Sequence, residues 1–411
     1  MVRNTQATAP HVVVVGAGFA GLAATRELAR GGARVSLVDH NPYTTFQPLL
    51  YQVATAGVAP GDVSFPVRAF AARYRNVRTR RAGLSKVRPG ERRVELDDGT
   101  SLEYDYLVLA SGVTTNWLGV EGAEENALPI YSVGDAVTLR ERLQRGLEET
   151  ATGRRESTHV VVVGGGATGV EMAGTLAELR RRTIPLTYPE LTSEQTSVTL
   201  VERFDHVLAP YKPRLRAAAD RALRRRGVRM RLGSTVARVE PDAVVLTDGT
   251  RLPSDVTVWA LGVTAPEEVA DWGLPQGKGG RITVTQELNV GTHPEVFVAG
   301  DLAGLPDPLP QLAQPAIQMG EHVGRQIIAT AQGRPATPFE YRDPGIMATV
   351  GRAEAVLQLS NGWTMHGLPA WLAWIGLHVA YLLGGRNRIS VLINFLWRYV
   401  GPRRTAASVI E

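Results

Sequence analysis

The chain has 411 residues, enough for two or three domains at roughly 150 residues each. Hydrophobic residues make up 44% and charged residues 21%, a balance that excludes disordered, collagen-like and coiled-coil proteins. Cysteine is absent, which excludes disulfide scaffolds, thiolate metal sites and thiol catalysis, and no metal site is predicted. The net charge is +5, but the basic residues are interspersed with helix formers and acids. That pattern favours solvated helix faces, so no nucleic-acid partner is expected.

A strand, a glycine turn, a helix and a second strand are predicted near the N-terminus. Val12–Val15 and Arg34–Asp39 have the β-branched character of neighbouring buried parallel strands. A helix is predicted between them, over about residues 22–30. The apolar stretch that follows Arg3 is interrupted by glycines and is not followed by a cleavage site. We therefore predict no signal sequence and a cytoplasmic protein.

The same pattern is repeated in the middle of the chain. The string HVVVVGAGFAG begins at His11, and HVVVVGGGATG begins at His159. The second copy predicts a strand at Val160–Val163, a helix over about residues 170–181 and a strand at Ser197–Glu202. The two copies indicate an internal duplication of a strand–helix–strand unit.

The duplication extends from these units to whole domains. Both copies continue with a hairpin at an Asp-Gly turn and an apolar strand that ends at a glycine. These strands are Arg93–Leu96, Tyr106–Ala110, Ala243–Leu246 and Val256–Leu261. A strand at Phe297–Asp301 is predicted to return to the first domain. The expected fold is α/β, with two Rossmann-like dinucleotide-binding domains, the second inserted in the first. Residues 1–120 and 281–337 would form the first domain, 121–280 the second and 338–411 a C-terminal region.

The first glycine turn has the spacing of a dinucleotide-binding motif. Gly16 permits the tight turn, Gly18 lets the backbone approach a pyrophosphate, and Gly21 lets the helix pack closely on the strand. The helix N-terminus offers free amides and the positive end of a dipole to the phosphates. Asp39 ends the next strand, at about the position where an acid binds a ribose hydroxyl. The motif therefore predicts a bound dinucleotide.

A second turn repeats this arrangement with Gly164, Gly166 and Gly169. Glu202 ends the strand that follows, at an interval longer than the usual ~20 residues, which predicts an inserted loop at residues 180–196. An acid at this position repels a 2′-phosphate and favours NADH, whereas the adjacent Arg203 leaves NADPH open. Two dinucleotide sites in one chain predict one tightly held cofactor and one that exchanges, namely FAD and NAD(P)H.

Further strings accompany the glycine turns. They are FQPLLYQVATAG at Phe46–Gly57, YDYLVLASG at Tyr104–Gly112, VFVAGD ending at Asp301, AQPAIQMG at Ala313–Gly320, MATVGR at Met347–Arg352 and GRNR at Gly385–Arg388. With these strings the chain resembles the type II NADH dehydrogenases, single-subunit NADH:quinone oxidoreductases of the two-dinucleotide-binding-domain flavoproteins, over nearly its whole length. Disulfide reductases and sulfide:quinone oxidoreductases share the fold but need redox thiols, which this chain lacks.

The resemblance implies the roles of several residues. The first glycine turn with Asp39 would bind FAD together with Gly300 and Asp301, and the second turn with Glu202 would bind NADH. The alternative for Asp301 is a helix N-cap. Glu171 follows the second turn, and in the family a glutamate here points toward nicotinamide and flavin. The alternative is an ordinary first-turn acid that the helix dipole stabilises.

The resemblance also implies a quinone site. Gln314 and Gln318 lie four residues apart and so share one helical face. In the family this pair lies at the flavin edge, where the quinone arrives. The alternative is two exposed helix glutamines. A second glutamine usually follows the latter one, and Met319 stands in its place, so the polarity of the quinone pocket is open.

The C-terminal region is unusually apolar. Leu368–Leu383 has no charge, but as a helix it would span about 24 Å, short of the ~30 Å hydrocarbon core. Ile389–Val400 is apolar apart from a stripe of Ser390, Asn394 and Arg398. The flanking residues are Arg386, Arg388, Arg403 and Arg404, with aromatic Trp371, Trp374, Trp397 and Tyr399. We predict an amphipathic anchor over residues 367–404 that lies on an anionic membrane surface. A buried helical hairpin or a dimer interface is the alternative.

Together these features predict an FAD enzyme that takes a hydride from NADH and passes two electrons to a membrane quinone without pumping protons. It would lie on the cytoplasmic side of the cell membrane, and a homodimer is open. Two alternatives are a soluble FAD-dependent NAD(P)H oxidoreductase with another acceptor, and a nucleotide-sensing protein without useful turnover.

Overall fold

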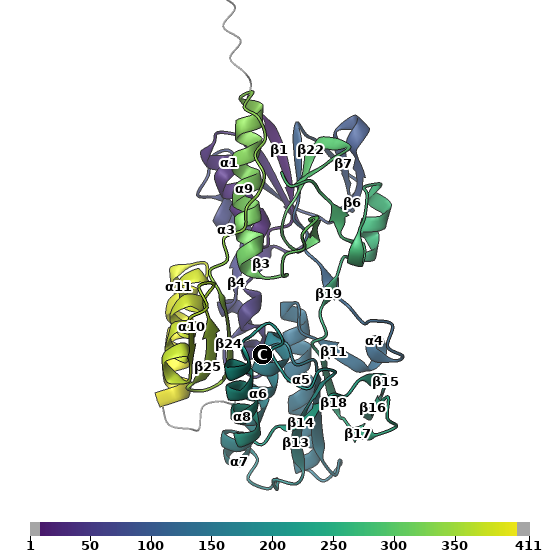
Figure 1. Ribbon diagram of the computed structural model, residues 1–411, viewed down its shortest axis with the longest axis vertical. Coiled ribbons are helices and arrows are strands. Elements are labelled where there is room, and N and C mark those ends of the chain that lie inside the picture. Colours follow the sequence, from purple (N-terminus) through teal and green to yellow (C-terminus); the bar gives the residue numbers. More distant parts are fainter. Residues whose placement is uncertain (1–8, 401–411) are drawn as a thin grey trace, which may run out of the picture. The chain divides into compact units, whose positions relative to one another are not determined.

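The computed structural model describes the backbone of residues 9–400 and the side chains of residues 9–397 (Figure 1). The chain forms two compact units, each assembled from three stretches of sequence. The first unit comprises the chain up to Thr44, Phe65–Thr114 and Val263–Asp343. The second unit comprises Thr45–Ser64, Thr115–Gly262 and the chain from Pro344 onward. The C-terminal region thus groups with the second unit.

The first unit is built on a six-stranded sheet. Its strands, in order across the sheet, are β21 (Asn289–Val290), β22 (His293–Val298), β9 (Tyr106–Leu109), β1 (His11–Val15), β2 (Arg34–Asp39) and β5 (Val77–Arg81). All neighbours are parallel except β21 and β22. Helices α1 (Phe19–Arg30) and α9 (Ala313–Ala331) pack against each other (Figure 1). Gly320 permits this close approach, because an added Cβ would lie 2.1 Å from the carbonyl oxygen of Ala20.

The second unit repeats this architecture with a five-stranded parallel sheet. Its order is β11 (Ala127–Pro129), β18 (Val256–Trp259), β12 (Thr158–Val163), β13 (Thr196–Glu202) and β14 (Arg229–Leu232). The helices α5 (Val133–Ala151), α6 (Ala167–Arg182) and α8 (Pro213–Arg225) belong to the same unit. Every residue of β13 is buried, including Glu202 at its end, and the residues before Glu202 are all apolar or small hydroxyl side chains.

The duplication predicted from the sequence is confirmed in detail. A three-stranded antiparallel sheet in the first unit comprises β6 (Leu84–Arg88), β7 (Arg93–Leu96) and β8 (Ser101–Glu103). Its counterpart comprises β15 (Val236–Glu240), β16 (Ala243–Leu246) and β17 (Arg251–Pro253). Asp105 accepts a hydrogen bond from the amide of His11 at 2.7 Å, and Asp255 accepts one from the amide of His159 at 2.7 Å. The two copies therefore share side-chain contacts as well as topology.

Two predicted segments differ in the structure. The strand predicted at Phe297–Asp301 ends at Val298, and Gly300–Leu302 form a 3-10 turn, η6, because Gly300 adopts a φ of +79°. Within the loop predicted at residues 180–196, α6 continues to Arg182 and a short helix, α7 (Ile184–Thr187), follows. Proline in the first turn of α7 suits a helix start, where its missing N–H costs nothing.

The C-terminal region consists of a small sheet and two helices (Figure 1). The antiparallel strands are β24 (Ile346–Gly351), β25 (Glu354–Gln358) and β26 (Thr364–His366), followed by α10 (Leu368–Tyr381) and α11 (Gly385–Val400). Strand β24 packs tightly on α6, because an added Cβ on Gly174 would lie 2.3 Å from the carbonyl oxygen of Val350. Among residues 9–400, no helix is both long enough and apolar enough to cross a membrane.

One prediction about this region is wrong. Trp371 and Trp374 were expected to be interfacial aromatics, but they are only 8% and 2% exposed. They are buried in the second unit, where Trp374 packs against the rings of Tyr51 on α2, His378 on α10 and Phe395 on α11. Trp397 is exposed, whereas the side chains of Arg398 and Tyr399, and all of Arg403 and Arg404, lie outside the described residues.

The remaining elements are short. The helices are α2 (Leu50–Ala54), α3 (Val67–Ala71), α4 (Ala123–Asn126), η1 (Gln47–Leu49), η2 (Pro60–Asp62), η3 (Pro89–Glu91), η4 (Glu267–Trp272) and η5 (Lys278–Gly280); the strands are β3 (Tyr43–Thr45), β4 (Ser64–Pro66), β10 (Thr114–Thr115), β19 (Val263–Thr264), β20 (Ile282–Thr283) and β23 (Ala303–Gly304).

Candidate functional site

The first glycine turn joins β1 to α1 and leaves one side open. Gly16 has a φ of +100°, and an added Cβ there would lie 2.2 Å from the carbonyl oxygen of Ala110. A Cβ on Gly21 would lie 1.8 Å from the carbonyl oxygen of Gly16. Gly18 is exposed, and a Cβ added to it would meet nothing within 4 Å. Two glycines are thus needed for packing, whereas the third faces open space at the N-terminus of α1.

Asp39 closes this turn from the neighbouring strand. Its Oδ2 accepts a hydrogen bond from the amide of Ala17 at 2.6 Å, and its Oδ1 accepts one from Asn41 at 2.7 Å. The carboxylate therefore fixes the conformation of the turn next to the C-terminal end of β2. Hydrogen bonds to a charged acceptor are among the stronger ones in proteins.

The segment that follows β22 packs against the beginning of α1, next to the first glycine turn. An added Cβ on Gly300 would lie 3.1 Å from Cβ of Ala20, at the beginning of α1. The amide of Gly300 donates to Sδ of Met319 at 3.3 Å. Burial raises the pKa of Asp301 to about 6, against an opposing effect of Arg281. The contact between Met319 and Gly300 has no local sequence signal, because it joins a loop to a helix turn further along the chain.

The second glycine turn, between β12 and α6, reproduces the first. An added Cβ on Gly164 would lie 2.4 Å from the carbonyl oxygen of Ala260, and one on Gly169 would lie 1.8 Å from the carbonyl oxygen of Gly164. Gly166 is exposed, and its added Cβ would meet nothing within 4 Å. The open position is again the middle glycine, at the N-terminus of a helix. The two turns therefore offer the same kind of anion-binding surface.

Glu202 has the same role in this turn as Asp39 has in the first. It is 7% exposed, its Oε2 accepts from the amide of Gly165 at 2.5 Å, and its Oε1 accepts from Phe204 at 3.0 Å. The guanidinium of Arg203 lies over the exposed ring of Phe204, 4.6 Å from its centroid. The acid is therefore bound to the turn, while the basic side chain next to it stacks on a surface aromatic ring.

Glu171 lies on α6, just beyond the first turn of the helix. The interpretation as a first-turn acid is therefore wrong, because the free amides that stabilise such an acid are already out of reach. Its Oε1 accepts a hydrogen bond from the amide of Thr349 on β24 at 3.2 Å. Burial raises the pKa of Glu171 to about 8, although the Thr349 amide and the indole of Trp374 act in the opposite direction. The carboxyl is therefore mostly protonated at neutral pH.

Gln314 and Gln318 lie one turn apart on α9, and both are half-buried. The Gln318 side chain makes two hydrogen bonds to the backbone of Arg342. Its Nε2 donates to the carbonyl oxygen at 2.9 Å, and its Oε1 accepts from the amide at 3.0 Å. Gln318 is thus not a freely exposed helix glutamine. Met319 is buried on the same helix.

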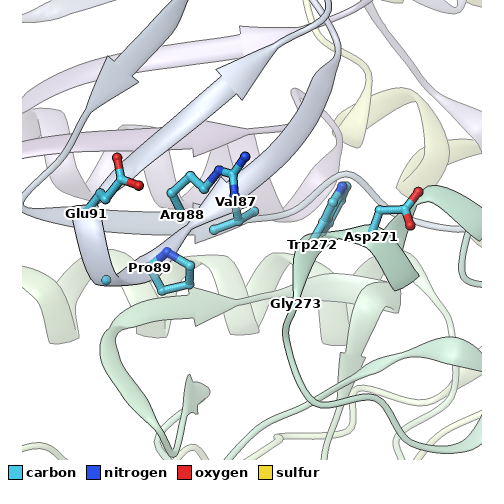
Figure 2. A pocket seen from close by; sticks show the side chains of 8 residues that line it. Val87, Arg88, Pro89, Glu91, Asp271, Trp272 and Gly273 are labelled. Carbon is cyan, nitrogen blue, oxygen red and sulfur yellow. The ribbon is translucent and has the colours of Figure 1, made fainter.

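The predicted site residues fall into two groups. The first turn, Asp39, Gly300, Asp301 and the two glutamines belong to the first unit, and the second turn, Glu202 and Glu171 belong to the second. A surface pocket of about 290 Å³ includes none of them. Figure 2 shows Arg88 and Glu91 on one side of this pocket and Asp271 and Trp272 on the other. Within the described part of the chain, no cluster of His, Asp and Glu could hold a metal ion.

Comparison with known proteins places the chain in a family. The family model of pyridine nucleotide-disulphide oxidoreductases matches residues 10–320. The type II NADH:quinone oxidoreductase Ndh of Mycobacterium tuberculosis is 33% identical over 98% of this chain and 90% of its own length. The internal alternative NAD(P)H-ubiquinone oxidoreductase A1 of Arabidopsis thaliana mitochondria is 30% identical over 96% of this chain and 85% of its own.

The fold agrees with this placement. A structure of NDH2 from Plasmodium falciparum in complex with NADH superposes with a TM-score of 0.88 at 17% identity, covering 96% of this chain and 99% of that one. A sulfide:quinone oxidoreductase from Aquifex aeolicus shares the fold at a TM-score of 0.76 and 19% identity, covering 96% of each chain. The sequence matches, rather than the shared fold, therefore decide between these classes, and the chain has no cysteine for thiol chemistry. The chain belongs to the type II NADH:quinone oxidoreductases.

Proposed function

We propose that the first glycine turn holds FAD, that the second binds NADH, and that the chain is a non-proton-pumping NADH:quinone oxidoreductase. The observation that supports this most directly is the repeated geometry of the two turns. In each, the middle glycine faces open space at a helix N-terminus while a carboxylate from the next strand binds the turn amides. One chain therefore offers two dinucleotide sites of the same construction.

The residues of the first unit fit FAD. The open side of Gly18 leaves room for a pyrophosphate to reach the backbone amides of α1, and Asp39 lies where a ribose hydroxyl would be bound. Gly300 places its backbone against the same end of α1, so Asp301 would hold the ribityl chain and the pyrophosphate. The partly buried Asp301 carboxyl, with its raised pKa, gains from a hydroxyl donor that replaces water there.

The second unit fits NADH by the same argument. Gly166 would admit the pyrophosphate, and Glu202 would accept from the adenosine ribose hydroxyls. A 2′-phosphate would lie against this buried carboxylate and be repelled by it. Arg203 stacks on the ring of Phe204, and its guanidinium would have to leave that ring before it could bind a 2′-phosphate. NADH is therefore the preferred donor.

Bound at the first turn, FAD would supply the chemistry that links hydride transfer from NADH to two-electron reduction of a quinone. Reduction to quinol also needs two protons, and Glu171 is a side chain suited to supply one. Its raised pKa keeps a proton on the carboxyl at neutral pH, while the Thr349 amide fixes the orientation of Oε1. On the first unit, Gln314 and Gln318 would contact the quinone, with Gln318 held in position by the backbone of Arg342.

We also propose that α10 and α11 attach the protein to the cytoplasmic side of the cell membrane as a peripheral protein. Large apolar side chains are exposed on both helices. This set of exposed residues, here called the apolar face, consists of Leu368, Leu372, Leu377, Tyr381, Ile389, Leu392, Ile393, Leu396 and Trp397. Asn394, from the predicted polar stripe of α11, points inward instead and donates to Asp62 at 3.0 Å. An apolar face directed outward with polar contacts directed inward suits a helix that lies in a membrane interface.

Anaerobic half-reactions test the enzymatic proposal. Addition of NADH to the purified protein should bleach the flavin absorbance, and addition of a quinone should restore it. A protein that binds no flavin would contradict the assignment of the first turn. A flavin that NADH reduces and quinone does not reoxidise would instead indicate another acceptor.

Vesicle binding tests the attachment. Leu372→Glu combined with Ile393→Glu should leave the protein in the supernatant of anionic vesicles and slow the reduction of long-chain quinones more than of short ones. Leu118→Glu is the matched control, because Leu118 is 56% exposed but lies outside the C-terminal helices. Equal vesicle binding by the double variant would contradict the proposal. Self-association that depends on protein concentration, and not on lipid, would show that a second copy covers the apolar face.

A further inference from the structure

The carboxyl of Glu171 interacts with the indole of Trp374, which lies on a helix much later in the chain. Within the described hydrogen-bond network it accepts from a single backbone amide, that of Thr349. The Thr349 hydroxyl is engaged elsewhere, donating to the carbonyl oxygens of Gly351 and Glu354. Strand β24 thus offers Glu171 only one donor, although an ionised carboxylate has room for several.

Trp374 on α10 supplies a second N–H in the same interior. Its side chain is 2% exposed, and its indole N–H is buried without an acceptor in hydrogen-bond geometry among the described residues. The indole N–H nevertheless lowers the pKa of the Glu171 carboxyl, which means that it favours the ionised form. A buried N–H that is left without an acceptor costs free energy, so this arrangement needs an explanation.

The ring of Trp374 is held firmly in place. His378, one turn later on α10, stacks on it at a centroid distance of 4.0 Å and an interplanar angle of 23°, and its Nδ1 donates to the Trp374 carbonyl oxygen at 2.7 Å. The rings of Tyr51 and Phe395 are also close, with centroids 6.2 Å and 6.4 Å from that of Trp374. The indole therefore cannot turn freely to find another acceptor.

We propose that Trp374 is a positioning residue for Glu171, and that its indole N–H is the donor that receives the carboxylate once Glu171 has given up its proton. In the protonated form, Glu171 accepts a hydrogen bond from the amide of Thr349, and the indole N–H has no acceptor within residues 9–397. After proton release, a small rotation of the carboxylate lets it accept a hydrogen bond from the indole N–H, so that the charge gains a donor and the N–H gains an acceptor. This inference rests on the proposed role of Glu171 as the group that holds a proton for quinone reduction.

Two titratable groups near this pair, His378 and Tyr211, are uncharged near pH 7. Burial lowers the pKa of His378 to about 4, so the imidazole that stacks on Trp374 carries no charge. Burial and the Glu171 charge both raise the pKa of Tyr211, which keeps its phenol protonated. Tyr51 on α2 faces Trp374 with an aromatic ring. Of the side chains around Glu171, the indole of Trp374 is the one that favours the ionised carboxylate through a hydrogen bond.

The pH dependence of the quinone half-reaction tests the inference. Trp374→Phe keeps an aromatic ring and removes the N–H, so it should move the loss of rate at high pH upward by about one unit, a tenfold change in proton affinity. The matched control is Trp371→Phe, the same change one turn earlier on α10 at a similarly buried indole. Its pH profile should follow that of the unaltered protein. An unshifted Trp374→Phe profile, or an equal shift in the control, would overturn the inference.

A spectroscopic measurement on the holoenzyme does not depend on its quinone-reducing activity. With ¹⁵N-labelled indoles, one resonance among the seven tryptophans should move with pH, and this movement should vanish in Glu171→Gln. The absence of a titrating indole resonance would overturn the inference. A further outcome separates the two proposals. If the indole resonance titrates in the unaltered protein but Glu171→Gln leaves the pH profile of quinone reduction unchanged, the contact between Trp374 and Glu171 stands and the proposed proton role of Glu171 fails.

Discussion

The raised pKa of Glu171 predicts that this single carboxyl destabilises the folded protein at neutral pH. Its pKa lies near 8 in the folded chain, above the ordinary value of 4.5. The folded protein therefore keeps a proton that the unfolded chain releases. The contribution of Glu171 to stability is fully present below about pH 4.5 and is lost progressively as the pH rises through about 8.

The size of the effect follows from the same two values. Each unit of pH between them costs about 1.4 kcal/mol, so the full effect at pH 7 is about 3 kcal/mol. Part of the Glu171 side chain remains accessible to water, which reduces this to an expected range of about 1–3 kcal/mol. Glu171→Gln, which is neutral at every pH, should therefore raise the free energy of unfolding by that amount at pH 7 and by little at pH 5.

Urea unfolding of both proteins at several pH values, with FAD in equal excess, measures the difference directly. Because the two chains differ at one residue, the other titrating groups cancel in the comparison. Stopped-flow measurements should also show a loss of function, since the more stable variant should reduce quinone more slowly at and below neutral pH, where Glu171 carries its proton, and the difference should narrow above about pH 8. A difference in unfolding free energy that does not change between pH 5 and pH 8 would refute the reasoning.

Three further predictions concern the nucleotide and quinone sites. Gly166→Ala should raise the Michaelis constant for NADH with an unchanged urea midpoint, whereas Gly169→Ala should lower the midpoint, because only its added Cβ meets backbone within 4 Å. Glu202→Ala should raise the Michaelis constant for NADH, relax discrimination against NADPH and cost about 1.5–3 kcal/mol of unfolding free energy from its lost amide contacts; an unchanged ratio of the two nucleotides in steady-state assays would exclude the ribose assignment. Gln318→Ala should slow flavin reoxidation by quinone more than reduction by NADH in stopped-flow traces, and it should expose the amide of Arg342 to faster hydrogen exchange.

Local patterns in the sequence determined the two-fold α/β plan. Runs of β-branched residues ending in glycine turns predicted β1 and β12, and the Asp-Gly dipeptides predicted both hairpins. Asp39 and Glu202 were also placed correctly at strand ends beside their turns. These features follow from the sequence because strand periodicity and turn chemistry depend on residues that are neighbours along the chain.

The tertiary structure alone decided which side chains meet across the chain. Periodicity could not tell that α10 turns Trp371 and Trp374 inward, because a helix that is apolar on all sides has no preferred buried face. Likewise, the pairing of Gln318 with the Arg342 backbone and the contact of Glu171 with Thr349 join segments that are distant in sequence. The environment of Glu171 is set by a strand and a helix that follow it by well over a hundred residues, so its raised pKa could emerge only once those elements had packed against α6.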